Sequence, residues 1–324
     1  MIMPALPKLL ATKIYKTGQT RGADDDVIYQ NRVGRSSTVL IPYSCWELCS
    51  KPQDGSENYE NGFIVLISPS DYFQNQNIFA DLALKGLEIG SNALLFYETR
   101  EQWNTNNPDQ LKWKPAENRT MPLGGQYVAR IPATTATGGE KIIRGFNATK
   151  MKGAGIRVYE YASSKTIEMC RFQLEALFWF CRDSEKVAAS NGITAKDAAT
   201  RKITILRICK EAGLLDLAKL AAGRILNTHG NTICPLCLKD FSAEGFFNRM
   251  EQAEGREVPD LTVTQINLFH VCELRTGVLN HRPYNVGWGH HHCNVVVKDS
   301  GIDKALEWMK DVVNRNIGQK IILR

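Results

Sequence analysis

The chain has 324 residues, 43% of them hydrophobic, and carries 40 Lys and Arg against 34 Asp and Glu, a formal net charge of +6. This length allows two or three domains with real cores, whereas every apolar stretch is far shorter than the roughly 20 residues of a transmembrane helix. The first residues show no secretory signal, and nine cysteines, an odd number, do not indicate a disulfide scaffold. We therefore expect a cytoplasmic protein without a membrane segment.

The first part of the chain alternates apolar runs with turns. Runs rich in β-branched and aromatic residues predict five strands, at 37–46, 62–68, 93–97, 127–132 and 155–161. The segment 78–89 has the apolar spacing of a helix. We expect a mixed α/β region over residues 1–162.

A basic segment lies near the end of that region. It contains five cations and no acidic residue: Lys141, Arg144, Lys150, Lys152 and Arg157. Such a loop suits contact with a phosphate backbone, although a solvated loop between strands would have the same composition. Residues from 231 onward contain 11 basic and 11 acidic residues, so the whole positive excess precedes them. The N-terminal part is therefore the expected place for holding a polyanion.

Residues 163–230 have the pattern of several helices. Ser164 is placed to cap the first of them. Thr194 and Asp197 have capping-box spacing, and Gly213 can end that helix. An apolar stripe indicates core or dimer surface rather than a cofactor site, and consists of Leu174, Leu177, Phe178 and Cys181. We expect this region to link the two ends of the chain or to dimerise.

The last third of the chain contains metal-ligand residues. Cys234 and Cys237 are separated by two residues, and His290 and Cys293 repeat that spacing. Three thiolates and one imidazole are a ligand set that structural zinc prefers. The 52 residues between the pairs must form a hairpin or more, whose ends the ion would hold together. The spacing predicts a structural zinc site.

Two alternatives to this ligand set stay open. Buried free cysteines beside a surface histidine run would have the same composition, but a second pair at ligand spacing is unexpected by chance. His291 and His292 follow His290 directly. The matched spacing favours His290, and the other two could face solvent, a phosphate or a second metal.

The order of residues between and after the ligand pairs resembles the HNH nuclease module, the ββα-metal fold. In that module a strand ending in a histidine turns through a glycine-containing loop to a second strand and then a helix. The residues that carry the resemblance are Phe269, His270, Val271, Gly277, His281, Asn285, His290, Cys293, Asn294 and Lys298. The resemblance covers residues from about 234 to 313, ending in an apolar helix face at 302–313.

The resemblance assigns a role to three residues. His270 would be the general base that takes a proton from the attacking water. Asn285 would brace the hairpin that carries this histidine. Asn294, at the helix start, would bind one catalytic divalent ion, expected to be Mg²⁺, which takes oxygen ligands.

One position departs from the family pattern. A metal-binding aspartate or histidine usually precedes the general base, and this chain has Phe269 there, which cannot bind a metal. The missing ligand would come from elsewhere, with Glu273 and His281 as the nearest candidates. A degenerate HNH fold kept for binding is the alternative.

The N-terminal run at 16–35 resembles the BstXI type of restriction enzyme. With the HNH resemblance, this implies a type II restriction endonuclease that hydrolyses double-stranded DNA. It also implies a homodimer on an interrupted palindrome, with structural Zn²⁺, catalytic Mg²⁺ and no small-molecule cofactor.

These expectations combine into an α+β fold with three regions. They are a mixed α/β DNA-recognition region at 1–162, a helical linker or dimerisation region at 163–230 and a zinc-stapled HNH module at 231–324. Two rival functions stay open: a non-restriction HNH nuclease, directed to modified bases or homing, and a zinc-stapled DNA-binding protein without catalysis. An aromatic base-binding pocket would favour the first, and a site without an oxygen ligand the second.

Overall fold

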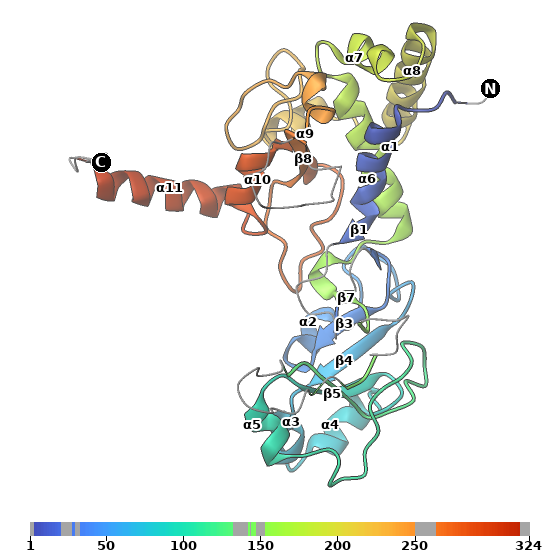
Figure 1. Ribbon diagram of the computed structural model, residues 1–324, viewed down its shortest axis with the longest axis vertical. Helices are drawn as coiled ribbons and strands as arrows, with labels where there is room; N and C mark the ends of the chain where they lie inside the picture. Colours follow the sequence, from blue (N-terminus) through green and yellow to red (C-terminus); the bar gives the residue numbers. More distant parts are fainter. Residues whose placement is uncertain are drawn as a thin grey trace. The chain divides into compact units, whose positions relative to one another are not determined.

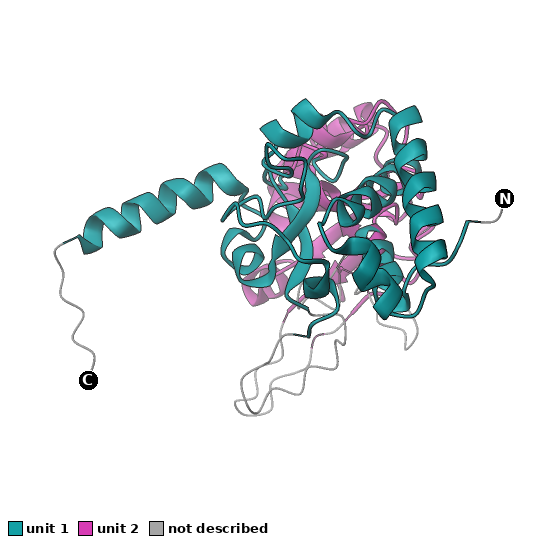
Figure 2. Cartoon of the chain, turned by 90° about the horizontal axis from the view of Figure 1, so that it is seen from above, with its two compact units in different colours: residues 1–17, 165–275, 280–324 teal, residues 18–164, 276–279 magenta. Residues whose placement is uncertain are grey.

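The computed structural model describes residues 3–20, 28–29, 33–131, 142, 144–146, 153–249 and 264–317. The chain packs as two compact units, coloured separately in Figure 2. Unit 1 comprises residues 1–17, 165–275 and 280–324, and unit 2 comprises residues 18–164 and 276–279. In the part of the chain that is described, no helix is both long enough and apolar enough to cross a membrane.

Unit 2 is built on a five-stranded parallel sheet with the strand order β6-β5-β4-β3-β7 (Figure 1). Its strands are β3 (Val39–Pro42), β4 (Phe63–Ile67), β5 (Ala93–Tyr97), β6 (Tyr127–Ala129) and β7 (Ile156–Arg157). Alternate residues of one strand enter two different apolar clusters: Val65 and Ile67 belong to one, Ile64 and Leu66 to the other. Both faces are therefore covered, which explains why these strands are continuous apolar runs.

Short helices and one small ladder complete unit 2. They are α2 (Trp46–Cys49), α3 (Pro69–Gln74), α4 (Ile78–Leu84), α5 (Arg100–Thr105), the 3-10 helices Tyr43–Cys45 and Val158–Glu160, and the antiparallel pair β1 (Gln19–Thr20) and β2 (Val33–Gly34). Ser68 caps α3 by accepting from the backbone of Asp71, and Thr99 with Gln102 forms a capping box for α5.

The five predicted strands are confirmed, but several end early. The run 37–46 is a strand only to Pro42, because a 3-10 turn and α2 follow it, and the run 155–161 enters a 3-10 turn after Arg157. The predicted helix 78–89 ends at Leu84, ahead of Gly86, whose φ is 65°. Helices α3 and α5 were missed, although their capping residues are visible in the sequence.

Unit 1 contains most of the helices and a two-stranded hairpin (Figure 1). Its elements are α1 (Lys8–Tyr15), α6 (Ser164–Trp179), α7 (Ser184–Ser190), α8 (Ala195–Glu211), α9 (Leu217–Ala222), the 3-10 helix Ala243–Phe246, β8 (Ile266–His270), β9 (Val286–His290), α10 (His291–Val297) and α11 (Ile302–Asn316). Another 3-10 turn, Lys16–Gly18, follows α1. Strands β8 and β9 are antiparallel, with His270 opposite Val286.

The helix signals are largely confirmed. Helix α6 begins at Ser164 as expected, but Ser164 is its first residue and not a side-chain cap, because its N–H and its hydroxyl both donate to the Glu60 carboxylate. Thr194 caps α8 by accepting from the N–H of Asp197, and α8 ends just before Gly213, whose φ is 68°. The predicted last helix, 302–313, continues to Asn316.

The predicted apolar stripe is core: Leu174, Leu177 and Phe178 lie in α6, and Cys181 follows shortly after its last residue, Trp179. All four of its residues are buried: Leu174, Leu177, Phe178 and Cys181. The indole N–H of Trp288 on β9 donates to the carbonyl of Leu174 at 2.8 Å, so the hairpin is fastened to this helix.

The chain is thus mixed α/β, with a parallel main sheet rather than the separate layers that α+β implies. Residues of 163–230 and of 231–324 share one hydrophobic core. The three-region division is accordingly a hypothesis about function and not a description of packing.

Candidate metal centre and histidine pair

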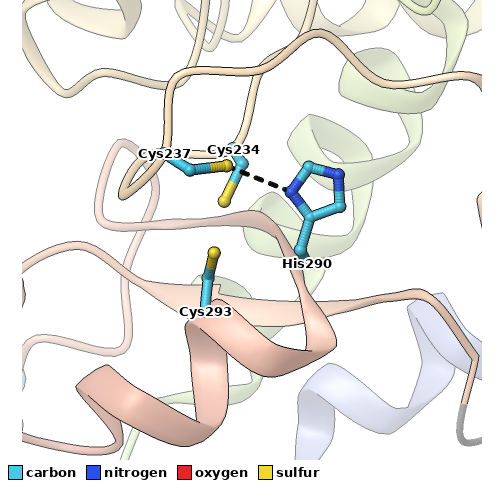
Figure 3. Close-up of side chains that lie close together, drawn as sticks. All are labelled: Cys234, Cys237, His290 and Cys293. Carbon is cyan, nitrogen blue, oxygen red and sulfur yellow. Dashed lines mark hydrogen bonds between the residues drawn. The ribbon is translucent and has the colours of Figure 1, made fainter. Parts of the chain in front are cut away.

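Four potential metal ligands come together in unit 1: Cys234, Cys237, His290 and Cys293. Their ligand atoms all lie within 4.8 Å of one another, and Cys237 Sγ is 3.3 Å from His290 Nδ1 (Figure 3). The first pair lies in a loop before the hairpin, His290 ends β9 and Cys293 lies in α10. The two pairs predicted from spacing therefore meet as one group of sulfur and nitrogen donors.

Local backbone geometry shapes the first pair as a knuckle. The N–H of Leu238 donates to the carbonyl of Cys234 at 2.8 Å, and the N–H of Cys234 donates to the carbonyl of Lys239 at 3.0 Å. Leu238 adopts a left-handed φ of 60°, which turns the chain back on itself. Both sulfurs of the pair consequently face the same side of the turn (Figure 3).

The electrostatics of the cluster disfavour free thiolates. Burial raises the pKa of Cys234, although the N–H groups of Cys237, His290 and Leu236 oppose this. Burial and the neighbouring cysteines raise the pKa of Cys293. Burial, helped by His292 and Lys239, lowers the pKa of His290. A divalent cation would reverse the balance at the cysteines, because it binds the thiolate form, and the lowered pKa keeps the imidazole neutral and ready to bind.

The other two histidines of the run lie outside this group of donors. His291 Nδ1 is 3.2 Å from the side-chain nitrogen of Asn267. His292 is exposed, and its ring stacks on that of His290 with centroids 5.5 Å apart. Of the three consecutive histidines, only His290 belongs to the group of potential ligands found among the described residues.

The proposed base, His270, ends β8 and is half-buried. Its Nε2 lies 3.0 Å from Nδ1 of His281, and Nε2 of His281 lies 3.2 Å from the hydroxyl of Thr17. His281 and Thr17 are fully buried. Sequence reasoning missed Thr17, since no local pattern links residues 264 positions apart.

Asn285 binds the backbone that follows His270. Its side-chain oxygen accepts from the N–H of Cys272 at 2.7 Å, and its side-chain N–H₂ donates to the carbonyl of Asn280 at 2.6 Å. The same N–H₂ group lies 3.4 Å from the carbonyl of Cys272. These bonds join the two ends of the connection between β8 and β9.

Phe269, which stands where the resemblance expects a ligand, and the candidate ligands Glu273 and Asn294 lie in different surroundings. Phe269 is completely buried, so it belongs to the core. Glu273 binds Lys304 and lies 3.2 Å from the guanidinium of Arg275; both cations lower its pKa, Lys304 more strongly. Asn294 is half-buried in α10, next to Cys293.

Two of the predicted DNA-binding cations lie in unit 2, where each contacts a carboxylate and an aromatic ring. Arg144 pairs with Asp109, and its guanidinium lies 5.0 Å from the ring centroid of Trp103. Arg157 lies 3.8 Å from Glu160 and 4.6 Å from the ring centroid of Tyr29. The other three predicted residues, Lys141, Lys150 and Lys152, fall outside the described residues.

Comparison with known proteins adds a family. The family model of the BstXI restriction endonuclease matches residues 12–291, a range that includes His270 and His290 and ends before Cys293. A solved structure described as a type II restriction endonuclease is similar at a TM-score of 0.30 and 15% identity, covering 50% of this chain. The chain spans about 59% of the length of that structure. No curated protein matches the chain.

Proposed function

This chain belongs to the BstXI restriction endonuclease family, and we propose on that basis that it cuts double-stranded DNA at a specific sequence, as a type II enzyme. The observation that carries the proposal is the family match over residues 12–291. We assign cleavage to the hairpin of β8 and β9 with α10, because a histidine ends the first strand and metal-ligand residues join the second strand to the helix.

The order strand, strand, helix in this hairpin supports an HNH-type module. Strands β8 and β9 pair antiparallel over five residues each, and α10 begins at the residue after β9 ends. Helix α10 packs on both strands. This is the succession that a ββα-metal fold requires.

In the proposed reaction, His270 removes a proton from a water molecule. The water oxygen forms a bond to phosphorus while the bond between phosphorus and the 3′ oxygen breaks. The electron pair of the broken bond stays on the 3′ oxygen, which then takes a proton from solvent. Asn285 contributes by holding the backbone of Cys272, two residues beyond the base, against the far end of the connection.

A catalytic Mg²⁺ would supply charge stabilisation for the phosphate and leaving oxygens. We propose Asn294 as its protein ligand. Glu273 is the second candidate, but its carboxylate would first have to leave Lys304 and Arg275. Restriction endonucleases in general need a divalent ion, and the Mg²⁺ dependence of an Asn294→Ala variant tests the assignment of this ion to Asn294.

Zn²⁺ fits the cysteine cluster, because three sulfurs and one nitrogen within 4.8 Å of one another form the donor set that zinc prefers. We propose a structural role. The ion would join the loop of Cys234 and Cys237 to the junction of β9 and α10, and so fix the helix that carries Asn294.

Residues 1–162, most of which belong to unit 2, are the proposed DNA-recognition region, with contributions from Lys141, Arg144, Lys150, Lys152 and Arg157. Arg144 and Arg157 would exchange their carboxylate partners for phosphates on binding. Residues 163–230 would link and dimerise the chain, and residues 231–324 would cut. A homodimer would place one cleavage site on each strand of an interrupted palindrome.

A DNA-binding protein without catalysis is the second candidate. Two observations favour it: Phe269 is buried where the family pattern places a metal ligand, and Glu273 is already paired with two cations. A non-restriction HNH nuclease is a variant of the first proposal, with the same cleavage site and a different target.

The test is incubation of the purified protein with mixed-sequence duplex DNA, with Mg²⁺ and with chelator, followed by mapping of the ends. Discrete Mg²⁺-dependent fragments are the expected result. DNA that stays intact but shifts in a gel would favour the second candidate, whereas cleavage restricted to DNA with modified bases would favour the non-restriction nuclease.

A further inference from the structure

The geometry points to His281 as a positioning residue for His270. We propose that a series of hydrogen bonds, from the buried Thr17 through the buried His281 to the half-buried His270, fixes the ring orientation and the tautomer in which His270 acts as a base. This inference rests on the proposed function, since it gives His281 a part in the same reaction.

The contacts of His281 are those of a side chain held at both ring nitrogens. Only 1% of its surface is exposed. Its Nδ1 lies 3.0 Å from His270 Nε2, and its Nε2 lies 3.2 Å from Thr17 Oγ1. The two rings are tilted by 55°, with centroids 5.2 Å apart, so they meet through their nitrogens rather than by stacking. A ring fixed at two points cannot turn without breaking a buried hydrogen bond.

Two neutral imidazoles that share one hydrogen bond must adopt opposite roles. If His270 Nε2–H donates to His281, then His281 carries its proton on Nε2 and donates to Thr17. His270 then presents the lone pair of Nδ1, which is the form a base requires. In the reverse direction Thr17 donates to His281, His281 donates to His270, and the proton of His270 resides on Nδ1, the wrong form for a base.

Further hydrogen bonds hold the segments that carry Thr17 and His281 against the hairpin of β8 and β9. Lys13 of α1 is buried and donates from Nζ to the carbonyl of Ile266 on β8 at 2.7 Å, which fixes the helix that precedes Thr17. On the other side, Asn280 precedes His281 and donates to the carbonyl of Glu273. The positions of the three side chains are therefore set before any DNA binds, as preorganised sites require.

The mechanistic consequence concerns the transition state. When His270 accepts the water proton it becomes an imidazolium, and a charged donor makes the stronger hydrogen bond to His281. The contact thus gains strength as the reaction proceeds, and this is the requirement for an effect on rate rather than on DNA binding.

The experiment compares matched variants in the full-length protein under single-turnover conditions, with duplex DNA and Mg²⁺. His281→Leu removes the acceptor, and we expect its cleavage rate to fall about 10²-fold, with unchanged DNA affinity and zinc content. His281→Asn keeps an acceptor, and its rate should recover to within about tenfold of the wild type. Thr17→Val should lower the rate less than His281→Leu does, whereas Thr17→Ser, which keeps the hydroxyl, should cleave as the wild type does.

A spectroscopic readout is independent of activity. Long-range proton–nitrogen spectra of histidine-labelled protein, assigned with His270→Ala, should show His270 protonated at Nε2, with that tautomer lost in His281→Leu. If His281→Leu fails to fold, the tautomer of His270 in the wild type and the comparison of Thr17→Val with Thr17→Ser test the positioning role instead.

The outcomes separate this inference from the proposed function. A wild-type protein that cleaves no DNA with any divalent ion would overturn both. Cleavage by the wild type that survives His281→Leu unchanged, or a His270 protonated at Nδ1, would overturn the positioning role alone. Parallel loss of DNA affinity and cleavage in His281→Leu would make the residue merely structural and would equally overturn it.

Discussion

The ring of Phe269 occupies the space that a side chain at Gly289 would need: a Cβ built on Gly289 would lie 2.3 Å from Cδ2 of Phe269. The two residues lie on neighbouring strands as a diagonal pair, since Phe269 is opposite Gly287 and Gly289 lies two residues further along β9. Phe269 is completely buried. Phe269 is therefore a core residue that requires a glycine across the hairpin.

Gly289→Ala is expected to destabilise the protein by about 1–3 kcal/mol, because the ring of Phe269 would have to move within a packed core. Denaturant unfolding measures the change. Gly287→Ala is the matched control, since a Cβ there would meet Ile225 at 3.5 Å, an ordinary contact. Equal stability of the two variants would show that the ring has room to shift.

Cys234→Ser should release zinc and unfold the C-terminal part of unit 1, because structural zinc contributes folding free energy directly. Metal analysis and thermal unfolding measure this. Cys45→Ser, at a half-buried cysteine of unit 2, is the control and should keep its metal. A soluble, active Cys234→Ser protein would exclude the staple.

The pH dependence of stability should have opposite signs with and without zinc. In the metal-free protein, burial raises the pKa of Cys234 above its ordinary value of 9.0, so the thiol is favoured in the folded state and stability should fall as pH rises above about 9. In the zinc-bound protein the ligands are thiolates, so stability should fall on acidification instead. The free energy of unfolding of both forms is measured from about pH 5 to about pH 10, a range that spans the ordinary pKa values of imidazole and thiol groups. Identical slopes of this free energy against pH in the two forms would contradict zinc binding at these cysteines.

His270→Ala should lower the cleavage rate by about 10²–10⁴-fold, the usual contribution of a general base, while leaving folding and DNA binding nearly intact. Cleavage and gel-shift assays on the same preparation separate the two effects. His292→Ala, at an exposed histidine outside the group of potential metal ligands, should cleave normally. Loss of DNA binding together with cleavage in His270→Ala would exclude the assignment of the base.

Asn294→Ala should raise the Mg²⁺ concentration needed for half-maximal cleavage by at least about tenfold, the usual effect of removing a direct or supporting group at a metal site. Glu273→Gln should change it little, because Lys304 and Arg275 already hold that carboxylate. Titration of cleavage with Mg²⁺ distinguishes the two residues. The reverse ranking would make Glu273 the ligand.

Much of the local structure follows from the sequence. The buried strands of unit 2 are continuous apolar runs, since both faces of a parallel sheet are covered. Thr194 and Gly213 mark the ends of α8 because their chemistry acts within one turn of the chain. Strand ends were less predictable: the run 37–46 stays apolar past Pro42, where the chain enters a helix instead.

The sequence by itself indicated the four potential metal ligands, because two residues between the members of a pair place both on one turn; the fold then brought the two pairs within 4.8 Å of each other. Only the tertiary structure decided which other groups meet. The contact of Thr17 with His281, the pairing of Glu273 with Lys304 and the burial of Phe269 over Gly289 all join residues brought together by the packing of separate elements. Such contacts depend on how all the elements of the chain pack together, and local periodicity or residue spacing does not predict them.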